Sequence, residues 1–368
     1  MKKVKFVDLS RQHASIKNDI RETALRVIDS GKYIGGEEVS KFEQEMANWL
    51  GVDEICGTGC ATSALYGVLK CIDVGPGDEV ITTVHTAIAT AEAISLNGAS
   101  VVFCDIAEDC YNLDLNDAES KINSKTKAII PVHLYGQPVD MDKVMAICSK
   151  YKLFLLEDCA QAQGASYKGK KVGTFGDAAA FSFFPSKTMG GFGDGGAVTV
   201  KDKALMRKVR MFLNHGRESK YFHEFEGTNS RLDTIQAAML RKCLTQIDIW
   251  NEQRRYAASI YDSLLKSIPE VSIPKVLPQT SPVYHVYVIT VPDREALIKF
   301  LKDNGIETGV HYPYSLNVLP AFERLKQGKG SFPRAEYACE HMLSLPLFPG
   351  IEKEEIEYVC EKIKDFFK

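Results

Sequence analysis

The chain has 368 residues, of which 45% are hydrophobic, and this length supports more than one core, so two domains are expected. The net charge is -3 and no block of Lys or Arg stands out, which argues against a nucleic-acid surface but leaves room for a local phosphate site. No apolar run approaches the roughly 20 residues of a membrane-spanning helix, and the N-terminal segment becomes polar too early for a signal peptide.

Short apolar runs alternate with amphipathic stretches between about residues 50 and 200. Helices are expected at 63–72 and 141–151. Strands are expected at 78–83, 100–106, 127–136, 151–158, 178–184 and 195–200. Near-continuous apolar strands separated by helices indicate a mainly parallel sheet that is covered on both faces, which is α/β architecture.

The later part of the chain has a different pattern of expected helices and strands. Helices are expected at 203–216, 232–265 and 294–305, and strands at 283–291 and 307–315. The last segment places Ile356, Val359 and Ile363 on one helical face. We therefore expect a large domain over residues 1–250, which includes an N-terminal arm, and a smaller α+β domain over residues 251–368.

The ten cysteines are scattered and form no CxxC pair. Several lie in apolar runs, where a free thiol behaves as a small buried hydrophobic group. This usage is typical of a protein whose thiols stay reduced in the cytosol, so we expect a cytoplasmic protein without disulfides.

Two carboxylates stand at the end of an expected buried strand. Glu157 and Asp158 close the run LLED, and Gln161 follows Asp158 in the sequence. Sheets of this kind bind ligands at the carboxyl ends of their strands. The alternative is an acidic turn that caps the next helix, and these residues taken alone favour it.

The stretch GTGCATSALYGVLK, residues 57–70, resembles half of a dinucleotide-binding fingerprint. The third glycine is missing, because Thr62 stands there, and no acidic residue ends a following strand at the right place, so a dinucleotide site is rejected. A helix N-terminus is the better interpretation, because free amides, the helix dipole and the hydroxyls of Thr62 and Ser63 would bind a phosphate. A plain Thr or Ser N-cap is the alternative.

The stretch FSFFPSKTMGGFGDGGAVTV, residues 181–200, sets one lysine among glycines. Ser182 lies near the end of an expected strand, and Lys187 follows it in the next turn. The glycines would let the backbone pass close to whatever Lys187 holds. The alternative is a mobile glycine loop with a solvated lysine.

A phosphate-binding helix end, an acid at a strand end and a lysine in a crowded turn together match the needs of pyridoxal 5′-phosphate (PLP). The lysine would form the Schiff base. The carboxylate would keep the pyridine nitrogen protonated, so that the ring can accept electrons; this pairing would lower the pKa of the acid and raise that of the pyridinium. No metal is expected.

Longer blocks extend the pattern: FVDLSRQHASIKNDI near the N-terminus, then CATSAL, PVHLYGQPVDMD, EDCAQAQGA, the lysine block and GTNSRLDTIQAAML. In these blocks the chain resembles the DegT/DnrJ/EryC1/StrS family of PLP-dependent sugar aminotransferases over nearly its whole length. The lysine block and NSRLDTIQAA are highly specific when they occur together. The resemblance implies the type I aminotransferase fold and a homodimer whose active sites lie at the interface.

The resemblance also implies a role for each matched residue. Lys187 would bind PLP covalently and later move the proton, Asp158 would pair with the pyridine nitrogen, and Gln161 would hydrogen-bond the 3′-oxygen of the ring. Asn229 would reach the phosphate of the neighbouring subunit's cofactor. Three hydroxyl side chains would hold the phosphate: Thr62, Ser63 and Ser182.

Two positions depart from the family's usual pattern. An aromatic residue that stacks on the cofactor ring usually precedes [IV]AT, and here that position is Ala87. Either His85 or another residue covers the ring, or that face is open for the substrate; a capping role in the turn is the structural alternative for His85. After HYP, many members that act on nucleotide sugars have Pro-Leu-His. This chain has Tyr-Ser-Leu-Asn there, ending at Asn317, so the identity of the substrate stays open.

Four residues are candidates for contact with the substrate: Tyr33, Arg231, His311 and Tyr312. Structural alternatives exist, because Tyr312 could pack the small domain and Arg231 could form an ion pair. Some relatives that dehydrate or deoxygenate sugars carry His in place of the lysine, so Lys187 favours transamination.

The expected activity is therefore transfer of an amino group from L-glutamate to a keto sugar, expected to be linked to UDP, dTDP or GDP, for polysaccharide, glycan or antibiotic-sugar synthesis. The two half-reactions would give ping-pong kinetics. The alternative within the same chemistry is a keto-cyclitol or another small ketone. The alternative from another class is a PLP-binding regulatory protein without turnover. The sequence shows no helix-turn-helix pattern and no basic patch, which argues against this alternative.

Overall fold

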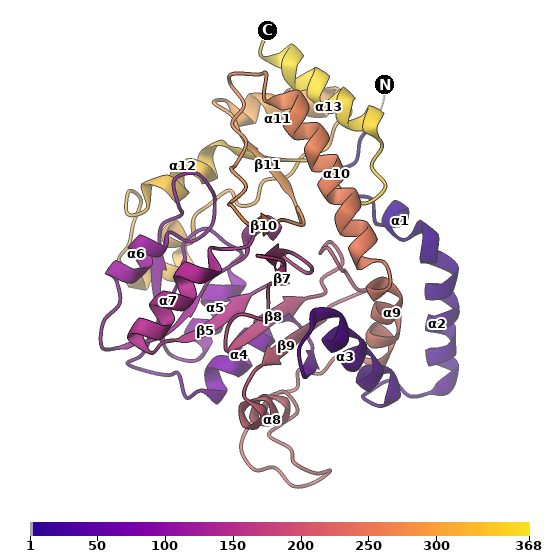
Figure 1. Ribbon diagram of the computed structural model, residues 1–368, viewed down its shortest axis with the longest axis vertical. Coiled ribbons are helices and arrows are strands. Elements are labelled where there is room, and N and C mark those ends of the chain that lie inside the picture. The colour runs from indigo at the N-terminus through magenta and orange to yellow at the C-terminus, as the bar shows by residue number, and fades with distance from the viewer. Residues whose placement is uncertain (1–2) are drawn as a thin grey trace.

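In the computed structural model, which describes residues 3–368, a seven-stranded sheet lies at the centre of the larger part of the molecule (Figure 1). Its strand order is β1-β9-β8-β5-β4-β2-β3. Neighbours from β3 to β8 pair in parallel, and β9 is antiparallel to β8 and β1, which confirms the expected mainly parallel sheet. The strands are β1 (Ile55–Thr58), β2 (Glu79–Thr83), β3 (Ser100–Cys104), β4 (Thr126–Ile130), β5 (Phe154–Asp158), β8 (Ala178–Ser182) and β9 (Gly196–Val200).

Helices cover both faces of this sheet, because adjacent strand residues point to opposite sides. In β5, Leu155 joins a core with α6 and α7, whereas Leu156 joins a core with α4, α5 and α8. Helices α2, α3 and α9 pack over Ala179 and Phe181 of β8. The covering helices are α2 (Lys17–Ser30), α3 (Glu37–Leu50), α4 (Ala61–Cys71), α5 (Ala89–Leu96), α6 (Leu115–Ser120), α7 (Met141–Tyr151), α8 (Lys203–Phe212) and α9 (Thr234–Leu244).

The C-terminal part packs around two antiparallel strands, β11 (Tyr287–Thr290) and β12 (Met342–Leu345). Its core contains Ile356, Val359 and Ile363, which confirms the expected apolar face of the last helix. A parallel bridge joins Val4 to Ile306, which follows α11. The helices here are α10 (Ile247–Leu265), α11 (Arg294–Asp303), α12 (Pro333–His341) and α13 (Lys353–Phe366).

Helix α10 connects the two parts. It starts in the core of the large sheet with Ile247 and Trp250, and it ends in the C-terminal core with Tyr261 and Leu265. The boundary expected between residues 250 and 251 falls within this helix. The division into 1–250 and 251–368 stays a prediction. None of the helices within residues 3–368 combines the length and the apolar character needed to cross a membrane.

The bounds of several expected elements differ from those in the structure. The strand expected at 127–136 ends at Ile130, because Pro131 has no N–H to give to a neighbouring strand. The helix expected at 232–265 is two helices, α9 and α10. The amide of Gln246 bonds to the carbonyl of Cys243 and closes the turn between them.

The strand expected at 307–315 does not form. Within that range only Gly309 makes a bridge, which is antiparallel to Ser344 of β12. The segment that follows is held by side chains instead, and Pro313 cannot donate to a ladder. This irregular backbone carries His311 and Tyr312 toward the ends of the large sheet, where the candidate site lies.

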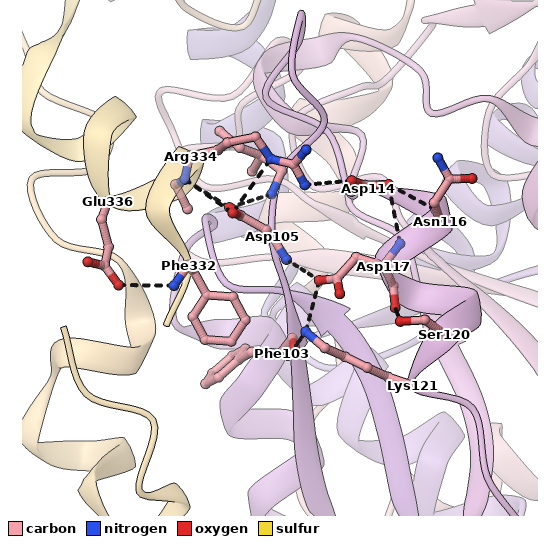
Figure 2. Close-up of polar contacts among 12 residues, drawn as sticks. Phe103, Asp105, Asp114, Asn116, Asp117, Ser120, Lys121, Phe332, Arg334 and Glu336 are labelled. Carbon is pink, nitrogen blue, oxygen red and sulfur yellow. Dashed lines mark hydrogen bonds and ion pairs between the residues drawn. The ribbon is translucent and has the colours of Figure 1, made fainter. Parts of the chain in front are cut away.

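A buried carboxylate fastens α12 to the large sheet (Figure 2). Asp105 follows β3, and its oxygens accept the backbone N–H of Ala335 at 2.8 Å and of Arg334 at 3.1 Å in the first turn of α12. The Arg334 guanidinium also contacts Asp105 and donates to Asp114, the N-cap of α6. The backbone N–H of Asp105 bonds to Asp117 in α6. One ion-pair network therefore joins the two parts of the chain.

Replacing Asp105 tests this connection. Asp105→Ala leaves the first N–H groups of α12 without their acceptor, and we expect the free energy of unfolding to fall by about 3 kcal/mol. The matched control is Asp109→Ala, which removes an exposed ion pair with Lys275 and should cost about 0.5 kcal/mol. Urea titration of both variants measures the difference, and equal losses would contradict the proposed fastening.

Candidate active site

One cavity brings five of the sequence-predicted residues together. A space of about 190 Å³ is lined by Thr62, Asp158, Gln161, Ser182 and Lys187, among others. Asp158 ends β5 and Ser182 ends β8, and these strands are parallel neighbours. The cavity therefore lies at the carboxyl ends of strands, which is where sheets of this kind bind ligands.

The N-terminus of α4 forms one wall of the cavity. Its N-cap is Cys60, whose sulfur accepts the backbone N–H of Ser63 at 3.5 Å, so neither Thr62 nor Ser63 is the cap. Thr62 lines the cavity, whereas the Ser63 hydroxyl lies 3.3 Å from the Cys60 sulfur. A Cβ at Gly196 would lie 2.7 Å from the amide nitrogen of Ala61, so glycine is needed there to let this helix end approach β9.

Asp158 is held in a fixed orientation. One of its oxygens accepts the hydroxyl of Thr90 at 2.7 Å, and the other accepts the backbone N–H of Ala160 at 3.0 Å. A carboxylate has about four sites for accepting hydrogen bonds, so acceptor capacity is left for a cationic ring nitrogen. Thr90 lies in the first turn of α5 and is itself buried.

Gln161 uses both ends of its amide within the protein. Its oxygen accepts the backbone N–H of Tyr135 at 2.8 Å, and its nitrogen donates to the hydroxyl of Tyr312 at 3.1 Å. Tyr312 is therefore placed next to the cavity by a residue that lines it. Burial raises the pKa of Tyr312 to about 12, so its hydroxyl stays protonated at neutral pH.

Lys187 sits in a tight turn, where its backbone N–H bonds to the carbonyl of Phe184 at 2.9 Å. Burial lowers the pKa of Lys187 to about 8, and the negative charge of Asp158 works in the opposite direction. A fraction of the amine is consequently neutral at physiological pH, far larger than for an ordinary lysine, and this neutral form is the nucleophile.

The glycines after Lys187 make close contacts within the chain itself. That they also give clearance around a ligand stays a prediction. A Cβ at Gly190 would lie 2.0 Å from the carbonyl oxygen of Pro185, and one at Gly193 would lie 2.8 Å from the amide of Gln236. Gly190 therefore lets the turn fold back on itself, and Gly193 lets the turn approach Gln236 of α9.

His85 lies outside the lining of this cavity, to which Thr86 and Ala87 contribute instead. Its ring is fully buried, its Nε2 lies 2.8 Å from the hydroxyl of Tyr135, and its Nδ1 lies 3.3 Å from the sulfur of Cys339. Burial lowers the pKa of His85 to about 4, so the ring is neutral. A stacking role for His85 stays a prediction.

His311 stands beside Tyr312 at the edge of the site. Its Nδ1 lies 2.9 Å from the hydroxyl of Ser344, and its ring stacks on Phe6 with the centroids 5.6 Å apart. Burial lowers the pKa of His311 to about 4, and the charge of Lys187 acts in the same direction. Lys187 is therefore near enough to influence the His311 ring electrostatically.

Three further predicted residues, like His85, lie outside the lining of this cavity. Tyr33 is half exposed and its hydroxyl donates to the carbonyl of Ile28. Asn229 is exposed, at an isolated bridge with Asn214. The Nε of Arg231 is buried and has no hydrogen-bond partner among the described residues, so no ion pair accounts for it.

Some site residues carried no signal in the sequence. Cys60, Phe184 and Asp194 line the cavity, and Thr90 orients Asp158. Thr90 stands in the block just after Ala87, but nothing local links it to an acid 68 positions later. The buried group of His133, Glu157 and Cys159 has the composition of a metal site, yet Glu157 accepts three backbone N–H groups and the His133 ring, which is a structural arrangement.

Comparison with known proteins identifies the family. Residues 14–364 match the profile of the DegT/DnrJ/EryC1/StrS aminotransferase family. The chain belongs to this family. It is 42% identical to a pleiotropic regulatory protein of Geobacillus stearothermophilus (99% of each chain) and 39% identical to a dTDP-3-amino-3,4,6-trideoxy-alpha-D-glucose transaminase of Streptomyces venezuelae (99% of this chain, 96% of the relative).

Other relatives at 39–40% identity are named as aminotransferases of dTDP- or UDP-linked sugars. The crystal structure of S. venezuelae DesV in complex with a ketimine intermediate superimposes with a TM-score of 0.97 at 39% identity, covering 100% of this chain and 99% of that one. These matches establish the type I aminotransferase fold and an aminotransferase that uses PLP.

The residues of the cavity fit this cofactor. The α4 N-terminus with Thr62, together with Ser182, offers amide and hydroxyl donors to a phosphate. Asp158 offers a fixed carboxylate to a protonated ring nitrogen, and Lys187 offers an amine of lowered pKa to an aldehyde. The donor set therefore matches the three functional groups of PLP: the phosphate, the pyridine nitrogen and the aldehyde.

The lowered pKa of Lys187 has a measurable consequence in the cofactor-free protein. Acylation needs the neutral amine, so the labelling rate of Lys187 should rise with pH and reach half its maximum at about pH 8, against about pH 10.4 for ordinary lysines. Mass spectrometry of peptides labelled at several pH values measures both. Asp158→Asn should move the Lys187 midpoint to lower pH, because the charge that favours the ammonium is gone; an upward shift would contradict this electrostatic account.

Proposed function

We propose that this enzyme transfers the amino group of L-glutamate to a nucleotide-linked keto sugar in the cytoplasm, for polysaccharide, glycan or antibiotic-sugar synthesis. The observation that carries the proposal is the joint position of Lys187, Asp158 and the α4 N-terminus in one cavity. The relatives named for dTDP- and UDP-linked sugars support the substrate class. All ten cysteines, which lie within the described residues, are free thiols, in keeping with a reducing compartment.

Bound PLP supplies the electron sink for the transfer. Lys187 would hold the cofactor and then, once released from it, act as the base that removes the α-proton of the donor and passes it to the cofactor. Asp158 would keep the ring nitrogen charged. Gln161, whose nitrogen already donates to Tyr312, would contact the 3′-oxygen of the ring. Thr62, Ser63 and Ser182 would bind the phosphate.

We also propose a homodimer in which each site uses both subunits. Three apolar side chains in or close in sequence to the cavity lining are exposed, namely Phe184, which lines the cavity, Ile88 and Phe192. The loop between α8 and α9 extends away from the body (Figure 1), and it carries the exposed Tyr221 and Phe222. A second subunit would cover these surfaces, and Asn229 at the end of the loop would reach the partner's phosphate.

The substrate would lie between the cavity and four residues: Tyr33, Arg231, His311 and Tyr312. The buried Nε of Arg231 lacks a partner among the described residues, so it is free to meet an anionic group. A keto-cyclitol or another small ketone is the alternative substrate. The alternative from another class is a PLP-binding regulator without turnover, which the regulatory relative at 42% identity supports.

Addition of L-glutamate to the PLP-loaded protein distinguishes an enzyme from a regulator. The enzyme should convert the PLP absorbance band to that of pyridoxamine phosphate, and a panel of keto-sugar nucleotides and keto-cyclitols should show which acceptor restores it. Lys187→Ala should lower this turnover by about 10³-fold or more, because base and nucleophile are lost together. An unchanged band after glutamate would contradict the transaminase assignment in favour of the regulator.

Mixing two inactive variants tests the shared site. In a hybrid of Lys187→Ala and Asn229→Ala subunits, one of the two sites would combine an intact Lys187 with an intact Asn229 of the partner. Random mixing makes about half of the dimers hybrid, so about one quarter of wild-type activity should return. The controls are the two variants taken through the same subunit exchange separately. Activity no higher than their average would argue against a site built by both subunits.

A further inference from the structure

The segment that supplies Asp158 and Gln161 to the cavity also supplies a third polar residue that faces the other way. Gln163 is fully buried and is not among the residues that line the cavity. The segment is compact, because the amide of Ala162 bonds to the carbonyl of Cys159 and the amide of Ala165 to that of Ala162. Gln163 is thereby fixed behind the wall that Asp158 and Gln161 form.

The Gln163 amide spans the two ends of the lysine turn. Its nitrogen donates to the backbone carbonyl of Ser182, and its oxygen accepts the hydroxyl of Thr188 at 2.5 Å. A carbonyl can only accept, so the amide nitrogen must face Ser182 and the amide oxygen must face Thr188. The hydroxyl proton of Thr188 is then committed to Gln163, and the orientation of the whole group is determined.

The turn between those two contacts is the one that carries Lys187. Its internal bonds include those from the amide of Lys187 to the carbonyl of Phe184, from the amide of Gly191 to the carbonyl of Phe183 and from the amide of Phe184 to the Ser182 hydroxyl, and all three are local contacts. Within the described residues, Gln163 is the side chain from outside the turn that bonds to both Ser182 and Thr188. Thr188 is fully buried and follows Lys187 directly.

Gln163 is itself anchored to α10. The side chain of Asn251 donates to the backbone carbonyl of Gln163 at 2.9 Å. A Cβ at Gly164 would lie only 2.4 Å from the Asn251 amide nitrogen, so this close approach requires glycine next to Gln163. The contact therefore connects the lysine turn to the long helix that joins the two parts of the chain.

We propose that Gln163 is a positioning residue that sets the separation between the Lys187 amine and the phosphate-binding end of β8 at Ser182. Because Gln163 belongs to the same short segment as Asp158 and Gln161, it also sets the position of the lysine relative to the groups that contact the cofactor ring. This role rests on the proposed PLP site. Gln163 itself touches neither the cofactor nor the substrate.

A purely structural role would look different in experiment. Loss of any buried hydrogen bond lowers the stability of the folded protein. Loss of a positioning contact also weakens cofactor binding, because the lysine turn must then be ordered when the cofactor binds. The dissociation constant for PLP, measured beside Tm, separates the two roles.

Thr188→Val is the principal variant, since it removes the hydroxyl with little change of shape and leaves the Gln163 contact to Ser182 in place. We expect its dissociation constant for PLP to rise about tenfold, which corresponds to one buried hydrogen bond. Thr188→Ser keeps the hydroxyl and should bind as wild type does. Thr199→Val is the matched control, because the Thr199 hydroxyl donates to the carbonyl of Gly173 at 3.1 Å, outside the lysine turn. It should lower Tm but leave PLP binding unchanged.

Gln163→Met removes both contacts at similar volume and should weaken PLP binding more than Thr188→Val. In the double variant Thr188→Val should add little further effect, because the group it bonds to is already gone. Equal PLP affinity of Thr188→Val and Thr199→Val, with wild-type binding intact, would overturn the role of Gln163 and leave the proposed function standing. Wild-type protein that fails to bind PLP at all would overturn both.

Discussion

The burial of the Lys187 amine opposite Asp158 is the constraint on which the rest of the site depends. Burial drives the amine toward its neutral form, and the nearby carboxylate limits this effect, so that the pKa is about 8. The balance requires a carboxylate that cannot move, and Thr90 and the backbone of Ala160 hold it. Parallel pairing of β5 with β8 sets the two groups at the same edge of the sheet, so the topology of the fold is what brings acid and amine together.

Close backbone contacts complete this arrangement. The turn that carries Lys187 folds back so tightly that a side chain at position 190 would meet Pro185, and α4 approaches β9 so closely that a side chain at position 196 would meet Cys60. Glycine at both places is therefore a packing requirement, and neither residue has a positive φ. The rigid turn agrees with the nearly complete burial of Thr188 and Gln163 beneath it. The lysine is presented by a packed loop, in contrast to the mobile loop that glycine content suggests.

Local sequence patterns predicted the sheet, its helices and the principal site residues, because apolar runs and strand ends are local properties. The pairing of Asp158 with Thr90 and of Gln163 with Thr188 joins residues far apart in the chain, so no local pattern encodes it. For the segment 307–315 the local pattern misled: its residues favour a strand, but contacts with distant side chains such as Gln161 determine its course. Asn317, where the chain leaves the family pattern, is buried and donates to Glu336, so it supports the fold of its own loop.

The buried His85 belongs to a chain of hydrogen bonds between the two parts of the molecule, and each bond in this chain has a defined donor. The Tyr135 hydroxyl donates its single proton to the carbonyl of His311, so it must accept from His85, which therefore carries its proton on Nε2. Nδ1 is then an acceptor, and the thiol of Cys339 in α12 donates to it. With a pKa of about 4 the ring keeps this tautomer at neutral pH. The chain of hydrogen bonds from Cys339 through His85 and Tyr135 ends at the backbone beside Tyr312. It therefore couples α12 to the cavity wall through neutral groups that do not change near neutral pH.

Ala87, two residues after His85, lines the cavity without a ring, and this small side chain leaves space on that wall.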